Sequence, residues 1–244
     1  MNERQRQVLA AIVEEYSKTA VPVGSQLLLE QYGFDVSSAT LRNDMIALEK
    51  AGLLYQPHTS AGRIPTDTGY RFFVEEIMPD ESLSISEQKS MQKELLTLRA
   101  KHTRLGRSTA KLLSALSGNL AVAGLGDNEG LYDFGMKELL ENPEFRELDE
   151  LCRLVEALDS LDEKFDTILA ELSKDETKIF IGKENPIAEI SNCSMMVAPY
   201  ENEEGRGILA IIGPKRMQYA KNKSLLDHMR KLLSASLVLI IFIR

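Results

Sequence analysis

The sequence predicts an α+β protein: an N-terminal winged helix-turn-helix, a long linking helix, and a C-terminal α+β domain that carries an acidic helical insert. Three observations lead to this prediction. Three short helical patterns precede a polar hairpin over residues 1–78, a heptad pattern runs through residues 79–123, and strand-like segments precede a last helix over residues 178–244. The insert occupies residues 124–177.

Composition and charge define the class of protein. The 244 residues are 43% hydrophobic and 27% charged, and the longest apolar run, LVLIIFI, is too short to span a membrane. The net charge of −8 comes mainly from the insert, which holds 17 acidic and 5 basic residues. The sign of the whole chain therefore says little about any one surface.

Metal, redox and catalytic sites are not indicated. Cys152 and Cys193 form no CxxC motif and are expected to be reduced thiols of a cytoplasmic protein. His58, His102 and His228 share no ligand spacing with them. Side chains of catalytic type form no constellation, so neither a cofactor nor an enzymatic activity is expected.

The N-terminal segment predicts three short helices. The first has an apolar stripe at helical spacing, made of Val8, Leu9, Ile12, Val13 and Tyr16. The motif TAVPVG ends it, Ser25 is expected to cap a second helix that stops at Gly33, and a third helix is expected over residues 38–51.

The third helix has the features of a DNA-recognition helix. A helical wheel buries Leu41, Met45 and Leu48 on one side. The exposed side, its flank and the start of the helix supply the predicted DNA contacts: Ser38, Ala39, Thr40, Arg42, Asn43 and Ile46. Asn pairs with adenine, Arg with guanine, and Ala meets a thymine methyl group. The alternative is an ordinary solvated helix face.

The stretch PHTSAGRIPTDTGYR (57–71) predicts the wing. Its narrow polar tip suits contact with a phosphate backbone, and an arginine beside it suits a minor groove. The predicted contacts of this hairpin are His58, Thr59, Ser60, Gly62 and Arg63. Pro65 stiffens the exit from the hairpin, and Thr66 is expected to cap the following helix.

A heptad seam is predicted between the domains. Its positions step by four and three: Met91, Leu95, Leu98, His102, Leu105, Thr109, Leu112 and Leu116. The seam predicts a parallel dimer contact. The alternative, a helix packed on its own domain, is equally compatible with the pattern.

The C-terminal segment predicts a sheet and a closing helix. KIFIG, SMMVAPY and GILAIIG are strand-like, and ENEEG is a hairpin turn between the last two. The closing helix has an apolar stripe of Leu225, Met229, Leu232, Ser236 and Ile240. Nothing in this segment marks a bound ligand.

Five motifs carry a resemblance to a known family: PVGS (22–25), VSSATLRNDM (36–45), LEKAGLLYQPHTSAGRIPTDTGYRFFV (48–74), IGKENP (181–186) and IIGPKRMQY (211–219). They closely resemble the heat-inducible transcription repressors of the HrcA family. The resemblance implies a cytoplasmic bacterial repressor that binds, as a homodimer, an inverted-repeat operator in double-stranded DNA upstream of chaperone genes. It also implies that the chaperonin keeps the repressor active, and that the C-terminal domain is GAF-like with a helical dimerising insert.

The sequence departs from the family pattern after LLSALSGNLAVAG (112–124). There the chain passes through LGDNEG directly into the acidic segment, where the family has several strands of the GAF-like sheet. The chain thus looks internally shortened, which leaves open whether its sheet is complete. A second function also fits the sequence, because a winged helix that binds protein instead of specific DNA suits the negative balance of residues 1–78.

Overall fold

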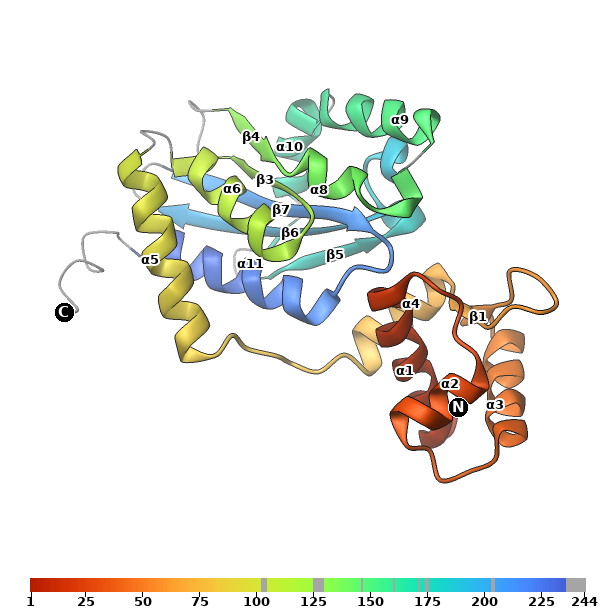
Figure 1. Cartoon of the computed structure of the whole chain (residues 1–244). Coiled ribbons are helices and arrows are strands. Elements are labelled where there is room, and N and C mark those ends of the chain that lie inside the picture. The colour runs from red at the N-terminus through yellow and green to blue at the C-terminus, as the bar shows by residue number, and fades with distance from the viewer. Residues whose placement is uncertain are drawn as a thin grey trace. The chain divides into compact units, whose positions relative to one another are not determined.

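The computed structural model describes residues 1–101, 105–124, 130–145, 147–159, 161–170, 172–173, 176–202 and 205–235. The chain folds into two compact units (Figure 1). The N-terminal unit contains Met1–Asp80 and Lys215–Tyr219, and the C-terminal unit contains Glu81–Pro214 and the chain from Ala220 onward. Helices and antiparallel strands occur together, which confirms the α+β class. Within the described residues, no helix has the length and apolar character that crossing a membrane requires.

The N-terminal unit contains, in chain order, α1 (Glu3–Thr19), α2 (Ser25–Tyr32), α3 (Ser38–Lys50), β1 (Leu54–Tyr55), β2 (Ile64–Pro65) and α4 (Asp67–Glu76). Asn2 begins α1 with a capping box, in which its side chain accepts from the Gln5 amide and the Gln5 side chain accepts from the Asn2 amide. The first four positions of the predicted apolar stripe of α1 are buried. Thr66 caps α4 as predicted, accepting from the Gly69 amide at 3.0 Å.

The start of α2 differs from the prediction. Gly24 occupies the N-cap position, and Ser25 is the first helical residue. The hydroxyl of Ser25 is used elsewhere, because it lies 2.9 Å from the hydroxyl of Ser38 at the start of α3. The predicted end of α2 is correct, since Gly33 adopts the left-handed conformation with φ of 65°.

A segment from late in the sequence completes the N-terminal unit. The ammonium of Lys215 lies 2.6 Å from a carboxylate oxygen of Asp67 in α4. The rings of Tyr219 and Tyr70 lie 5.8 Å apart, and both residues are buried. The motif IIGPKRMQY therefore supplies part of the N-terminal unit's own packing.

The C-terminal unit is built around one sheet. Its elements are α5 (Ile85–Lys101), α6 (Leu105–Ser117), β3 (Leu120–Gly124), β4 (Leu131–Phe134), α8 (Met136–Leu140), η1 (Pro143–Phe145), α9 (Leu148–Asp159), α10 (Leu161–Ala170), β5 (Lys178–Ile181), η2 (Gly182–Glu184), η3 (Ala188–Ile190), β6 (Cys193–Asn202), β7 (Gly205–Pro214) and α11 (Tyr219–Ser234). The strands have the order β4-β3-β7-β6-β5, and every neighbouring pair is antiparallel.

The three predicted C-terminal strands correspond to β5, β6 and β7. Each of β6 and β7 is ten residues long, and their pairing runs from Cys193 opposite Pro214 to Asn202 opposite Gly205. Three residues of the predicted turn ENEEG, Glu201, Asn202 and Gly205, belong to these two strands. The other two, residues 203 and 204, lie outside the described residues.

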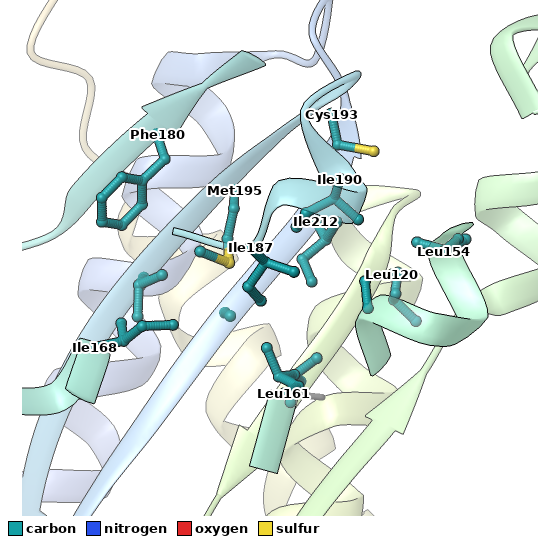
Figure 2. Close-up of a cluster of buried hydrophobic side chains, with 14 of the residues drawn as sticks. Leu120, Leu154, Leu161, Ile168, Phe180, Ile187, Ile190, Cys193, Met195 and Ile212 are labelled. Atoms are coloured by element: carbon teal, nitrogen blue, oxygen red, sulfur yellow. The ribbon is translucent and has the colours of Figure 1, made fainter. Parts of the chain in front are cut away.

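The acidic insert shares the core of this sheet. Apolar side chains of α9 and α10 join strand residues in one buried cluster, and Figure 2 shows Leu161 and Ile168 of α10 in it with Met195 and Ile212 of the sheet. Acidic residues such as Glu156 in α9 are exposed. Helix α9 is thus amphipathic, with acidic residues exposed and apolar residues in the shared core.

The single linking helix predicted over residues 79–123 is wrong. The chain forms two helices, α5 and α6, which pack on each other. Met91 and Leu95 are each 2% exposed in α5, and Leu105 and Leu112 are 6% and 1% exposed in α6. Two helices that pack together can share one apolar repeat. The heptad spacing therefore does not distinguish them from one long helix.

The remaining seam positions are buried to different extents. Leu98 and Leu116 are half-buried, Thr109 is buried, and His102 lies outside the described residues. Packing within one chain therefore accounts for most of the seam, and pairing between two chains stays a prediction. In the closing helix, Leu225, Met229 and Leu232 are buried as expected, whereas Ser236 and Ile240 lie outside the described residues.

His228 of α11 makes the stability of the C-terminal unit depend on pH. Partial burial lowers its pKa, a hydrogen bond with the backbone of Gln88 opposes that shift, and the charge of Lys231 adds to it. Protonation of His228 therefore favours the unfolded chain. The contribution of the neutral imidazole to stability is complete above the ordinary pKa of 6.5 and is lost as pH falls through the lower folded pKa.

We expect the free energy of unfolding to decrease below pH 6.5, and less steeply in His228→Gln. Urea titrations across this range measure both slopes, and equal slopes would contradict the assignment.

Candidate nucleic-acid interface

The buried side of α3 fixes the helix against the rest of the unit. Leu41, Met45 and Leu48 are at most 4% exposed, as the helical wheel predicts. Asp44 is buried beside them, and its carboxylate accepts from Nε of Arg4 in α1 at 2.6 Å. Sequence reasoning missed this pair because the partner lies 40 residues away and no pattern links the two.

The opposite side of α3 is open to solvent. Ala39, Arg42 and Asn43 are exposed, and Ile46 is half-buried. Within the described residues, no hydrogen bond or ion pair is recorded for the side chains of Arg42 and Asn43. The structure thus places the predicted base-reading residues on one accessible helix face.

The first turn of α3 is held by hydroxyl groups. Ser37 caps the helix by accepting from the Thr40 amide at 3.1 Å, and its hydroxyl also lies 2.9 Å from the hydroxyl of Thr40. Ser38 pairs with Ser25 of α2. The first contact caps α3 and the second joins α2 to α3, so the predicted DNA contacts Thr40 and Ser38 already have structural roles.

The side-chain amide of Gln56 holds the hairpin tip, residues 58–62, through two hydrogen bonds. Nε2 of Gln56 donates to the carbonyls of Thr59 at 3.0 Å and Ala61 at 2.8 Å. The Ala61 amide donates to the carbonyl of His58, which closes the turn. His58, Thr59 and Ser60 are exposed. Sequence reasoning gave Gln56 no role, because a single glutamine in a polar stretch carries no signal.

The base of the hairpin is joined to the connection between α1 and α2. The Val23 amide donates to the Arg63 carbonyl at 2.9 Å, and the Arg63 amide donates to the Val23 carbonyl at 2.8 Å. At Gly62, a Cβ atom would lie 2.4 Å from the Val23 carbonyl carbon and oxygen and 2.7 Å from the Pro22 carbonyl carbon. The backbones meet so closely that only glycine fits.

The side chain of Arg63 is directed to α3. Its Nη2 lies 2.9 Å and its Nε 3.0 Å from one carboxylate oxygen of Glu49, near the end of that helix. The side chain of Arg63 is 11% exposed. Its guanidinium therefore joins the exit from the hairpin to the end of α3.

A concave surface lies between α2, α3 and the hairpin. It encloses a cavity of about 560 Å³. Of the predicted contacts, six line this cavity: Arg42, Ile46, Thr59, Ser60, Gly62 and Arg63. Gln26 and Gln56, which were not predicted, also line it. Ser38, Ala39, Thr40, Asn43 and His58 are not part of its lining.

The chemistry of this surface is recognition by hydrogen bonds and shape. Its side chains are amides, hydroxyls, two guanidinium groups and the apolar side chains of Met45, Ile46 and Ala61. Amides, hydroxyls and guanidinium groups are the side chains that bind base edges and phosphates in protein–DNA complexes. Among the residues that the structure describes, no cluster of three or more His, Cys, Asp or Glu side chains could hold a metal ion.

Comparison with known proteins connects this surface to a family. The family model described as "HrcA protein C terminal domain" matches residues 80–222. A "Heat-inducible transcription repressor HrcA" from Synechococcus elongatus is 29% identical over an alignment that covers 90% of this chain and 93% of the relative. One from Thermodesulfovibrio yellowstonii is 27% identical and covers 97% of this chain and 98% of the relative.

The same comparisons bear on the length of the chain. The alignment with the Synechococcus elongatus relative extends over 328 positions, whereas this chain has 244 residues. That relative therefore has internal residues that this chain lacks, in agreement with the predicted shortening.

Among solved structures, a hypothetical protein whose crystal structure has 2.2 Å resolution is similar to this chain, with a TM-score of 0.71 and 22% sequence identity. The match covers 96% of both chains, and at this identity it shows the fold alone.

The close approach at Gly62 can be tested directly. In Gly62→Ala the new Cβ would overlap the Val23 carbonyl, so we expect the hydrogen bonds between Val23 and Arg63 to break. Amide hydrogen exchange at these two residues should then become at least about tenfold faster, since an opening cost of about 1.4 kcal/mol is removed. Ser60→Ala, at the exposed tip, is the matched control and should leave both rates unchanged. Unchanged exchange in Gly62→Ala would contradict the packing described for this position.

Proposed function

Because the chain belongs to the HrcA family, we propose that it is a transcription repressor of heat-shock genes that binds an inverted-repeat operator in double-stranded DNA. The observation that carries the proposal is the exposed face of α3, which presents Ala39, Arg42 and Asn43, together with a hairpin tip held by hydrogen bonds from Gln56. We propose further that the N-terminal unit is a winged helix-turn-helix with this tip as its wing, and that the C-terminal unit is GAF-like. The members of this family are repressors and not enzymes.

The two parts of the surface have different tasks in this proposal. The face of α3 enters the major groove, where Asn43 and Arg42 read bases and Ala39 contacts a methyl group. The wing tip lies along the backbone, where the hydroxyls of Thr59 and Ser60 donate to phosphate oxygens and His58 reaches the adjacent sugar or phosphate. The phosphate contacts position the helix, and the base contacts supply specificity.

Charge limits how strongly such a surface binds DNA nonspecifically. Residues 1–78 hold 7 basic and 10 acidic residues, so the unit attracts phosphates weakly overall. Binding then depends on fitted contacts more than on counterion release, and the salt dependence of affinity should be shallow. The same negative balance favours the second candidate, a winged helix that binds a protein partner.

An inverted repeat calls for two copies of the chain. A single recognition helix reads one half-site, and a two-fold axis relates two half-sites, so we propose a homodimer as the DNA-binding form. Leu98 and Leu116 of the predicted seam are half-buried and stay available as part of the interface. The family resemblance also makes the chaperonin a proposed partner, and the cytoplasm, where bacterial DNA lies, the proposed location.

Selection from a duplex pool distinguishes the two candidate functions. The pool contains randomised inverted repeats with spacers of different lengths, and bound duplexes are recovered with the full chain. We expect enrichment of one half-site sequence at one spacer length. Recovery of no preferred sequence, with the chain folded, would favour the protein-binding function.

Base readout by α3 has a specific signature. Replacing Arg42 or Asn43 with Ala should cost about 1 to 3 kcal/mol of binding energy and relax the preference at one position of the selected half-site. Lys50→Ala, at the exposed far end of α3, is the control and should leave base preference unchanged. Competition binding against single-base variants of the duplex measures the effect. Equal losses on selected and scrambled DNA would argue against base contact.

A further inference from the structure

The hairpin cannot set its own direction. Its strands β1 and β2 have two residues each, and a two-stranded hairpin of that length is marginal without other contacts. Contacts outside the ladder therefore hold it, and at its base Thr66 donates to the carbonyls of Gly52 and Leu53. Nearest the tip are two further contacts, the backbone bridge between Val23 and Arg63 and the ion pair between Arg63 and Glu49.

The position of Glu49 is unfavourable unless it is paired. Glu49 is the second-last residue of α3, where the helix dipole disfavours a negative charge. It also lies on a unit proposed to approach phosphates. Arg63 compensates both effects, since two of its N–H groups donate to one oxygen of this carboxylate. Turning Arg63 away to reach DNA would leave Glu49 unpaired beside the DNA.

We propose that Arg63 and Glu49 are positioning residues whose ion pair fixes the wing tip relative to the recognition helix, and that Arg63 does not itself contact DNA. The proposal rests on the proposed DNA-binding function. It replaces the role in phosphate or minor-groove contact that the sequence predicts for Arg63. At 11% exposure, the Arg63 side chain offers DNA little accessible surface while the pair is formed.

The two roles of Arg63 predict opposite effects of Glu49→Ala. If the pair positions the wing, removing the carboxylate loosens the wing and weakens binding. If Arg63 contacts DNA, the same change frees its guanidinium and removes a repulsive charge, so binding strengthens. Whether Glu49→Ala lowers or raises the affinity for DNA therefore distinguishes the two roles, whatever the size of the change.

The experiment uses the full chain, the duplex recovered by the inverted-repeat selection, and a scrambled duplex of the same composition. Glu49→Ala and Arg63→Ala should each weaken binding to the selected duplex by about five- to tenfold, and the double variant should be no weaker than either, because coupled residues are not additive. Arg63→Ala should leave the slope of log K against log salt unchanged. Binding to the scrambled duplex should change little.

Two outcomes would overturn the proposal. One is a Glu49→Ala variant that binds as tightly as the unmodified chain or more tightly, and the other is an Arg63→Ala variant whose salt slope falls by about one unit. Failure of the unmodified chain to select any duplex would instead refute the proposed function, so the two failures are distinguishable.

Matched variants control for charge and folding. Glu75→Ala removes a carboxylate of the same unit from a 3.7 Å ion pair with Arg71 in α4, and it should leave the ratio of selected to scrambled binding unchanged. Glu49→Gln keeps the shape of the side chain and removes its charge. If Arg63→Ala does not fold by circular dichroism, weakened binding by folded Glu49→Gln still supports the proposal, and unaltered binding overturns it.

Discussion

The hairpin of the N-terminal unit has strands of only two residues, so its direction depends on contacts outside them, above all on two backbone hydrogen bonds between Val23 and Arg63. These bonds join the connection between α1 and α2 to the exit from the hairpin. They require the backbones to meet at Gly62, where no side chain fits. The motifs PVGS and HTSAGR lie far apart in the sequence, and their residues belong to this one contact.

The C-terminal unit shows why net charge is a poor guide to a surface. The segment with the strongest negative balance, residues 124–177, supplies apolar side chains from α9 and α10 to the core of the sheet. Its exposed acidic residues lie in a different unit from α3, the proposed recognition helix. The overall charge of −8 is therefore compatible with a DNA-binding function, because the charge is concentrated away from the sequence that forms the proposed interface.

Local patterns made much of the fold predictable. The stripe Leu41, Met45 and Leu48 gave the orientation of α3, and long apolar strands gave the β6–β7 hairpin. Contacts between distant residues could not be predicted in this way. The burial of Asp44 could not be predicted because its partner Arg4 is distant in the sequence. The ion pair of Arg63 with Glu49 could not be predicted for the same reason. The single linking helix was predicted wrongly for a related reason, since spacing alone does not tell one long helix from two that pack together.

The inclusion of Lys215–Tyr219 in the N-terminal unit has a consequence for how the protein is made. Asp67 and Lys215 are separated by 148 positions, so their pairing closes a very long loop, whose entropic cost grows only slowly with length. During synthesis, the ribosome must reach residue 219 of 244 before Tyr70 can meet the ring of Tyr219. A gene fragment that ends near codon 80 encodes an incomplete folding unit, even though it contains every residue of the helix and hairpin proposed to read the operator.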